Sequence, residues 1–406
     1  MTGTFNALKV TDNVYWVGAI DFAVRDFHGY LTSRGTTYNA YLVTGEKVAL
    51  IDTVKAGFAD EMLARIASVT DPRKIDVIVS NHAEPDHSGS LTETIAACEP
   101  EKVYASKKGC QALRAHYGLD GVLTAVEDGQ TLSLGNLDLT CVETPMCHWP
   151  DSMVTYLHED ELLFSQDIFG MHLATYEMFD DLVDESVMDH EAAKYYANIL
   201  LPLSAFVTKA LRRVEELDIS LKIIAPDHGP IWRDDPAKIV RSYVRWATQP
   251  RVNKAIVVYD TMWKSTERMA RAIGEGLASG GAHTRLMPMS SCHRSDVATE
   301  LMDAGALVVG APTLNAQMFP TVADVLTYVK GLRPRGLIGA AFGSYGWGAR
   351  ASKQIGDMLE TMQVELVAEP LEVNYVPGTE ALKRCYELGR TIAAKLRDKF
   401  GHSPSA

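Results

Sequence analysis

The first 248 residues alternate short apolar segments with polar turns. β-Branched and aromatic residues dominate these segments, and Gly, Asp or Asn residues bound them, which is typical of strands. Helical patterns appear between the strands, and this mixture predicts a sheet sandwich flanked by helices. We expect strands at 14–18, 37–43, 48–53, 77–80, 102–105, 137–143, 153–158 and 161–165, and helices at 58–69, 90–97, 107–115 and 189–216.

The pattern changes near residue 250, where strands and helices begin to alternate strictly. Five strands alternating with helices predict a doubly wound parallel sheet of about 150 residues. Because 406 residues exceed what one hydrophobic core usually organises, we expect two domains, 1–249 and 250–406. The predicted strands of the second domain are 254–259, 284–289, 306–310, 337–342 and 365–368. Its first predicted helix begins at about residue 266, and the others span 297–303, 322–330, 352–362 and 379–398.

Composition narrows the class of protein. Hydrophobic residues make up 47% of the chain and charged residues 22%, as in soluble globular proteins. We find neither an apolar run of about 18 residues, as a membrane span needs, nor a signal peptide in residues 1–10, so we expect a cytoplasmic protein that does not bind membranes. The net charge of -13 repels phosphate backbones, so we expect no nucleic-acid partner.

The six cysteines contain no CxxC pair. We interpret them as buried thiols in a reducing cytosol. The absence of paired cysteines in the sequence argues against an internal iron–sulfur or rubredoxin-type site.

A dense group of metal-binding residue types follows the apolar segment 75–80. Within Asn81-His82-Ala83-Glu84-Pro85-Asp86-His87-Ser88-Gly89, four side chains that can bind a metal fall within six residues. A loop that leaves a strand end can direct such side chains toward one point, whereas a helix spreads them around its axis. Other candidates follow later strands. The predicted metal-binding residues are His82, Glu84, Asp86, His87, His148, Asp167 and His228.

This loop resembles the HxHxDH loop of metallo-β-lactamase-type hydrolases, with Glu84 in place of the second histidine. An anionic carboxylate suits iron better than zinc. The variant HxExDH resembles the flavodiiron proteins. That resemblance implies two iron ions, one bound by His82, Glu84 and His148, and the other by Asp86, His87 and His228, with Asp167 bridging. His87 is not a ligand in every family member, and for Asp52 both an outer-sphere role and a plain turn role stay open.

The second domain carries three loops at positions where a doubly wound fold binds its ligand. The first opens a helix whose hydroxyls and N–H groups suit a phosphate monoester, and the lack of a GxGxxG fingerprint favours a mononucleotide. Flavodoxins usually carry glycine where Lys264 stands. The three loops resemble those of flavodoxin and imply FMN, bound by Thr261, Met262, Trp263, Lys264, Ser265, Thr266, Pro312, Thr313, Leu314, Asn315, Gly343, Ser344, Tyr345, Gly346 and Trp347.

The resemblance to flavodiiron proteins, also called A-type flavoproteins, covers the whole chain and its domain order. It implies a metallo-β-lactamase-like αββα sandwich followed by a flavodoxin-like domain, in the simplest class without fused rubredoxin or reductase modules. Electrons would pass from an external donor, a separate rubredoxin or a deazaflavin-type hydride donor, to FMN and then to the di-iron site, which reduces O2 to water, NO to N2O, or both. A head-to-tail homodimer or a dimer of dimers would bring the cofactors together.

His28 and Tyr195 are the expected catalytic residues, since a His and a Tyr beside the irons can donate a proton to reduced oxygen species. Two other functions compete with the reductase. One is a zinc-dependent hydrolase with an appended flavodoxin-like regulatory domain, against which Glu84 argues. The other is an electron carrier with a degenerate metal domain, although no ligand is missing from the pattern. The sequence leaves the preference between O2 and NO open.

Overall fold

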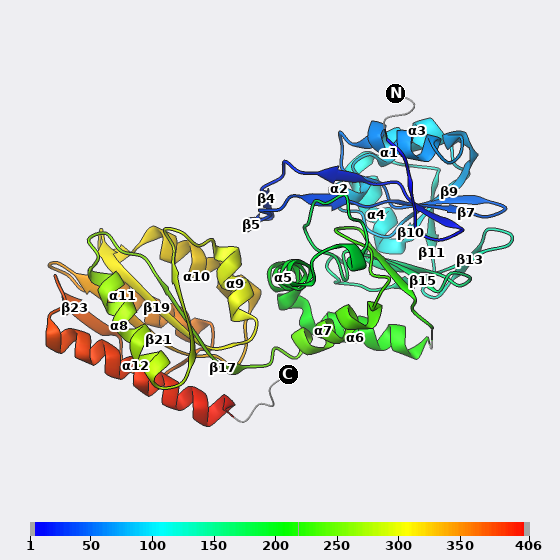
Figure 1. The fold of residues 1–406 in the computed structure, drawn as a ribbon. Coiled ribbons are helices and arrows are strands. Elements are labelled where there is room, and N and C mark those ends of the chain that lie inside the picture. Colours follow the sequence, from blue (N-terminus) through cyan, green and yellow to red (C-terminus); the bar gives the residue numbers. More distant parts are fainter. Residues whose placement is uncertain (1–4, 218, 402–406) are drawn as a thin grey trace. The chain divides into compact units, whose positions relative to one another are not determined.

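The computed structural model describes residues 5–217 and 219–401. The chain divides into two compact units, residues 1–247 and 248–406, and each has hydrophobic clusters of its own. Both units combine strands with helices (Figure 1). The predicted fold class, an αββα sandwich followed by a doubly wound parallel sheet, is confirmed.

Two sheets form the centre of the first unit. A seven-stranded sheet has the order β1-β2-β7-β8-β9-β10-β11 and a five-stranded sheet the order β12-β13-β14-β15-β16. Their facing surfaces share one buried cluster, which joins Trp16 and Tyr41 to Phe164. The strands are β1 (Leu8–Lys9), β2 (Val14–Trp16), β7 (Tyr41–Thr44), β8 (Val48–Ile51), β9 (Ile75–Ser80), β10 (Lys102–Ser106), β11 (Leu123–Val126), β12 (Thr131–Ser133), β13 (Asp138–Glu143), β14 (Met153–Leu157), β15 (Leu162–Gln166) and β16 (Ile223–Pro226).

Helices cover the outer faces of this sandwich. Buried residues of α1, α3 and α4, such as Met62, Leu91 and Leu113, pack on the seven-stranded sheet in a second cluster. Two short hairpin-like pairs, β3 with β6 and β4 with β5, lie off the main sheets. These elements are α1 (Ala59–Ala67), α2 (Pro85–Ser88), α3 (Leu91–Cys98), α4 (Lys107–Tyr117), α5 (Glu185–Tyr195), α6 (Ser204–Glu216), α7 (Pro236–Ala247), β3 (Ala19–Asp21), β4 (Asp26–Phe27), β5 (Tyr30–Leu31) and β6 (Thr36–Tyr38).

The prediction of a single helix at 189–216 is wrong. The structure ends α5 at Tyr195, continues through a π-helical turn (Tyr196–Leu200) and a 3₁₀ turn (Leu201–Leu203), and begins α6 at Ser204. Pro202 lies in the 3₁₀ turn. Proline has no N–H to donate, and its ring clashes with the carbonyl of residue i−4. A continuous α-helix therefore cannot pass this point without distortion.

The second unit is built on a parallel sheet with the order β18-β17-β19-β21-β22. Counted along the chain this is the 2-1-3-4-5 order of flavodoxin-like folds. The fifth strand expected at 365–368 is shorter, β22, and a second segment, β23, follows it; both pair with β21. Pro370, which has no N–H to donate to a ladder, lies between them. The elements are β17 (Val252–Tyr259), α8 (Ser265–Ser279), β18 (His283–Pro288), α9 (Arg294–Leu301), β19 (Ala304–Leu314), β20 (Gln317–Met318), α10 (Pro320–Leu332), β21 (Ile338–Tyr345), α11 (Ala351–Thr361), β22 (Glu365–Leu366), β23 (Leu371–Asn374) and α12 (Thr379–Phe400).

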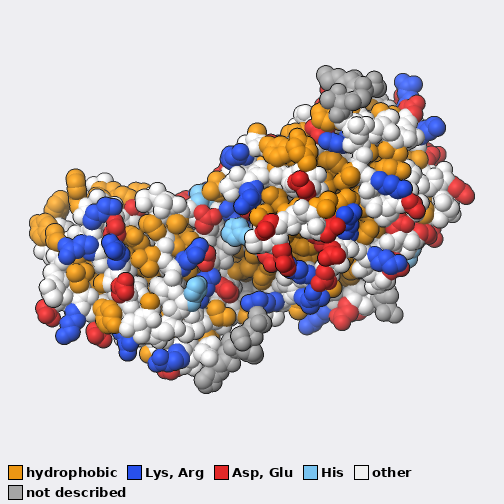
Figure 2. Space-filling model, viewed as in Figure 1, with side chains coloured by type: hydrophobic (Ala, Val, Ile, Leu, Met, Phe, Trp, Pro, Cys, Tyr) orange, Lys and Arg blue, Asp and Glu red, His pale blue; other side chains and the backbone are white. Residues whose placement is uncertain are grey.

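The composition bears on three features of the structure: the surface charges, the hydropathy of the helices and the burial of the cysteines. On the face shown in Figure 2, acidic and basic side chains are interspersed over both units. Within residues 5–217 and 219–401, no helix has the length and hydropathy required to span a membrane. The six cysteines are all free, five of them buried and Cys292 half-buried.

Helices α8 and α12 approach each other through glycines. A Cβ atom added to Gly276 would lie 2.0 Å from the carbonyl oxygen of Tyr386, and one added to Gly389 would lie 2.1 Å from that of Ile273. Real Cβ atoms do not come this close to backbone oxygens, so the two helices can pack this tightly only because both positions lack a side chain.

We predict that Gly276→Ala destabilises the second unit by about 1–3 kcal/mol, because the added methyl group forces the helices apart. Gly331→Ala is the matched control: Gly331 also lies within a helix, α10, but a Cβ there meets nothing within 4 Å, so the change should stabilise by up to about 1 kcal/mol through helix propensity. Urea unfolding followed by circular dichroism measures both. Equal midpoints for the two variants would contradict the packing argument.

Candidate functional site

The side chains of the candidate metal site come from loops that follow β9, β13, β15 and β16. His82 and Glu84 leave the end of β9, and His148 lies between β13 and β14. Asp167 and His228 follow β15 and β16, which pair in parallel. Since the ends of parallel neighbours meet at one edge of a sheet, these two side chains reach the same place.

Asp86 and His87 do not lie in an extended loop as the sequence predicts. They belong to the short helix α2, which begins at Pro85. Proline is suited to the first position of a helix because that position needs no N–H donor. The helical turn still directs both side chains inward, since Asp86 and His87 are buried.

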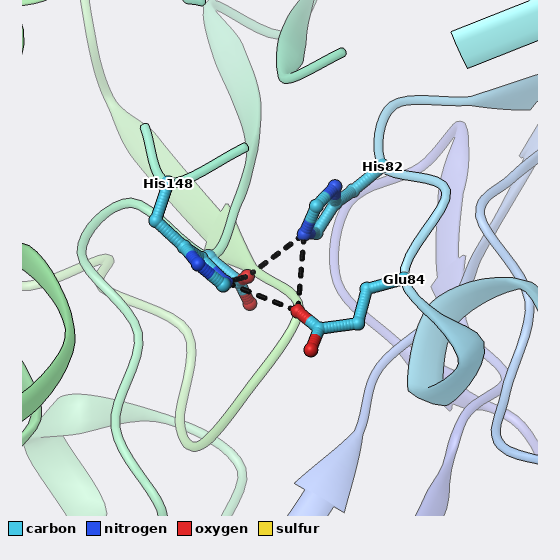
Figure 3. Close-up of side chains that lie close together, drawn as sticks. His82, Glu84 and His148 are labelled. Carbon is cyan, nitrogen blue, oxygen red and sulfur yellow. Dashed lines mark hydrogen bonds and ion pairs between the residues drawn. The ribbon is translucent and has the colours of Figure 1, made fainter. Parts of the chain in front are cut away.

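The first group of candidate ligands contains His82, Glu84, His148 and Asp167, whose ligand atoms all lie within 4.8 Å of one another. Figure 3 shows the two imidazoles and the Glu84 carboxylate pointing toward one another. Glu84 Oε2 lies 3.2 Å from His82 Nε2 and 3.1 Å from His148 Nε2. This is the convergence that a single cation requires.

The second group contains Asp86, His87 and His228. His228 Nε2 lies 3.1 Å from Asp86 Oδ2, and His87 Nε2 lies 3.4 Å from Asp86 Oδ1. All three side chains are buried. The group therefore offers two imidazole nitrogens and one carboxylate at a second point.

Asp167 lies between the two groups. Its Oδ2 is 2.9 Å from His148 Nε2 and faces the first group, whereas its Oδ1 is 3.2 Å from His87 Nε2 and faces the second. One carboxylate that offers one oxygen to each side is the geometry of a bridging ligand.

A further layer of polar groups orients the imidazoles through their other nitrogen. His82 Nδ1 lies 3.0 Å from Asp151 Oδ2, and His228 Nδ1 donates to the Thr37 carbonyl at 2.6 Å. Asp227 Oδ2 lies 3.4 Å from His87 Nδ1. Such contacts fix the ring so that Nε2 points at the metal. The sequence analysis missed the roles of Asp151 and Asp227, because an Asp near a His in a turn gives no distinct signal.

Asp52 anchors the backbone where the metal loop begins. Its carboxylate accepts hydrogen bonds from the Asn81 backbone N–H at 2.7 Å and from Asn81 Nδ2 at 2.9 Å. It therefore fixes the residue before His82. Burial raises the pKa of Asp52 to about 6.

Several buried polar atoms in the site have no hydrogen-bond partner. They include both carboxylate oxygens of Asp86, Nε2 of His87 and Oδ1 of Asp167. These atoms lie near one another, but their geometry is not that of hydrogen bonds. Buried polar atoms without partners are costly, and a metal ion at the point they surround would satisfy them. The second group therefore fits one metal ion, and the convergence of the first group fits another.

The site also needs positive charge inside it. Burial lowers the pKa of His82, but its bonds to Asp151 and Glu84 outweigh this and raise that pKa to about 10. Burial raises the pKa of Glu84, but hydrogen bonds from His148 and His28 hold it well below its ordinary value. The Glu84 carboxylate is thus ionised and needs positive charge nearby, which either protonated histidines or metal cations supply.

His28 and Tyr195 both lie at this site. His28 stands at the tip of the β4–β5 hairpin with its side chain 47% exposed, and its Nε2 lies 2.6 Å from Glu84 Oε1. Tyr195 is buried at the end of α5, with its ring 5.1 Å from that of His172. His172 was not singled out from the sequence; its ring lies 4.7 Å from that of His228, and its buried Nε2 has no hydrogen-bond partner.

The second unit contains a cavity of about 790 Å³ at the carboxyl ends of β17, β19 and β21. Its size is that of a cofactor pocket. The N-terminus of α8 opens onto it through Ser265. Of the predicted flavin-binding residues, the cavity is lined by Thr261, Met262, Trp263, Ser265, Pro312, Thr313, Leu314, Asn315, Ser344, Tyr345, Gly346 and Trp347.

Three predicted flavin-binding residues do not line this cavity. Lys264 points to solvent and pairs with Glu267, while its backbone adopts the left-handed conformation with φ of 68°, which explains why glycine suits this position in flavodoxins. Thr266 is buried and lies 2.9 Å from Ser344 Oγ, and Gly343 belongs to β21. The sequence analysis missed Ala316, Gly348, Arg350, Tyr375 and Val376, which also line the cavity.

Known proteins resemble the chain over nearly its full length. Residues 36–229 match the ODP family beta lactamase and residues 257–389 match the flavodoxin family. A nitric oxide reductase from Moorella thermoacetica is 47% identical over 96% of this chain and 99% of the relative.

Solved structures agree. The rubredoxin oxygen:oxidoreductase of Desulfovibrio gigas superposes with a TM-score of 0.95 at 43% identity, covering 97% of this chain and 99% of that one. The flavodiiron protein of Giardia intestinalis superposes with a TM-score of 0.93 at 35% identity, covering 98% of both chains. Together with the paired metal-ligand groups and the cofactor-sized cavity, these similarities place the chain in the flavodiiron protein family.

Proposed function

We propose that this protein is a flavodiiron reductase that uses electrons from an external donor to reduce O2 to water, NO to N2O, or both. The observation that carries the proposal is the position of Asp167, with one oxygen toward each group of candidate ligands. The similarity to a nitric oxide reductase and to a rubredoxin oxygen:oxidoreductase supports it. The metal domain would span residues 1–249 and the flavin domain residues 250–406.

We assign the first iron to His82, Glu84 and His148, the second to Asp86, His87 and His228, and the bridge to Asp167. Short distances and burial support these assignments. His87 belongs to the set because its Nε2 faces both Asp86 and Asp167, while its Nδ1 faces Asp227. Glu84 supplies the hard anionic oxygen that favours iron over the zinc of a hydrolase.

The cavity of the second unit would hold FMN. Thr261 and Ser265 would bind its phosphate at the N-terminus of α8, where N–H groups and the helix dipole favour an anion. Asn315 and Ser344 offer further polar atoms in the lining, and Trp347 offers a flat surface for the ring. When bound, the flavin and the iron pair supply the electron relay and the place where the small molecule is reduced.

For electron transfer between the flavin and the irons we propose a head-to-tail homodimer, or a dimer of dimers, as the resemblance to the family implies. The rim of the flavin cavity supports such a contact, because Trp263 and Trp347 are 89% and 98% exposed. Contiguous exposed apolar patches mark surfaces that bind another protein. We also propose a cytoplasmic location and a separate rubredoxin as donor, with a deazaflavin-type hydride donor as the alternative.

His28 and Tyr195 would provide protons. His28 holds a proton between its Nε2 and Glu84 Oε1, and this bond raises the pKa of His28. Tyr195 keeps its hydroxyl proton, because burial raises the pKa of the phenol well above its ordinary value. Both reductions consume protons, so groups that hold a proton beside the reacting molecule accelerate them.

The proposal predicts that the purified protein contains FMN and two irons per chain, and that it turns over O2 or NO when reduced anaerobically. Steady-state rates with each gas and a panel of donors, rubredoxin and a reduced deazaflavin among them, measure this and separate the two substrates. The active species should be a dimer or larger in sedimentation. Two zinc ions with no iron, and no turnover of either gas, would revive the hydrolase.

Glu84→His should convert the loop to the hydrolase pattern. We expect the affinity for iron to fall by more than about tenfold, zinc to replace it, and turnover of O2 and NO to be lost. Glu84→Asp, which retains the carboxylate, is the control and should keep more iron than the histidine variant. Metal analysis after expression in medium with equal iron and zinc measures both. An unchanged iron content in Glu84→His would show that this carboxylate does not select the metal.

His28→Phe should lower kcat by about tenfold or more while the iron content and the KM for the gas stay unchanged. His28→Gln is the control, because its amide still donates a hydrogen bond toward Glu84 and should recover part of the rate. Tyr195→Phe should also slow turnover. If His28→Phe keeps the wild-type kcat with both irons bound, His28 has no catalytic role.

A further inference from the structure

A second cavity lies within the first unit, between α6 and the five-stranded sheet. Val207, Ala210 and Val214 of α6 form one wall, and Val154 of β14 and Leu163 of β15 form the other. Its volume is about 10 Å³, room for the centre of one water-sized sphere. It is separate from the flavin cavity, with which it shares no residue.

The cavity is apolar. It exposes no polar surface, and ten residues line it, most of them aliphatic: Thr144, Cys147, Val154, Leu163, Ile168, Phe169, Val207, Ala210, Leu211 and Val214. A buried water needs two to four hydrogen-bond partners. Thr144 Oγ1 is buried without a partner and offers only one. A small apolar guest therefore fits this space better than water does.

The cavity lies directly behind two loops of the metal site. Cys147 immediately precedes His148, and Ile168 and Phe169 immediately follow Asp167. The two loops are joined to each other, because Gln166 Nε2 donates to the Cys147 carbonyl. The Phe169 segment is fixed as well, since its N–H donates to Tyr243 Oη at 2.8 Å and its carbonyl accepts from Trp232 Nε1 at 2.9 Å. A rigid apolar space thus adjoins the residues that carry two of the candidate ligands.

We infer that this cavity binds dissolved diatomic gas and forms part of the route by which O2 or NO reaches the metal site. The inference rests on the proposed function, which supplies the gas. O2 and NO are small and nearly apolar, so they partition into a dry apolar space, as xenon does in cavities lined by Leu, Ile and Phe. Hydrogen bonds from Gln166 and Trp232, and one to Tyr243, hold the two loops that form one side of the space.

Xenon tests the site itself. Crystals of the full-length holoprotein pressurised with xenon should show a xenon atom among Val207, Ala210 and Leu163. Ala210→Phe should abolish the xenon site by filling the cavity, and Val207→Ala should raise its occupancy by enlarging the cavity. Ala205→Phe is the matched control, because Ala205 lies on the exposed face of the same helix. A wild-type cavity that holds water, or nothing, overturns the inference.

Rapid mixing tests the route. The bimolecular rate constant of the fully reduced protein with O2 should fall about tenfold in Ala210→Phe, the low end of the range over which association rates vary among mutants. Iron and FMN contents should stay unchanged, and Ala205→Phe should react like the wild type. Xenon binding with an unaltered rate in Ala210→Phe would overturn the role in gas entry. Failure of every variant, the wild type included, to react with O2 or NO would contradict the proposed function and leave the xenon result standing.

Discussion

The site depends on the burial of carboxylates together with imidazoles at one edge of the sandwich. Glu84, Asp86 and Asp167 are nearly inaccessible to solvent, so their charges must be balanced inside the protein. Asp167 links the two groups of candidate ligands, because each of its oxygens faces a different pair of histidines. The surrounding fold is arranged to hold that carboxylate: parallel strands β15 and β16 bring Asp167 and His228 to one edge, and the Gln166 side chain bonds the loop of His148.

The polar groups around the candidate ligands fix the orientation of the imidazole rings. Asp151, Asp227 and the Thr37 carbonyl each contact the Nδ1 atom of a different histidine. The Nε2 atom of each ring therefore faces inward. Removing one of these groups would free a ring to rotate without deleting a ligand. The hairpin that carries His28 adds a contact to Glu84 from the solvent side, which makes Glu84 the point where the buried ligands and the outer surface of the site meet.

The sequence predicts the parts of this structure that local pattern determines. The order of strands and helices, the residues after β9 and the three loops of the flavin domain could be read directly, because each depends on neighbouring residues. Asp151 and Asp227 could not, since their roles arise only when distant loops meet. Tyr375 and Val376 line the flavin cavity because they directly follow β23, which pairs with β21 beyond the end of the predicted fifth strand. The helical pattern on both sides of Pro202 predicts one continuous helix, whereas the proline interrupts it.

The burial of the thiols has a consequence for durability. An enzyme that reduces O2 is exposed to peroxide and superoxide whenever a reaction cycle is interrupted, and these oxidants attack thiolates first. Five of the six cysteines here are buried, and burial raises the pKa of Cys141 and Cys147 to about 12. They remain neutral thiols and react slowly. Oxidative inactivation would thus begin elsewhere, at Cys292 or at accessible methionines such as Met262.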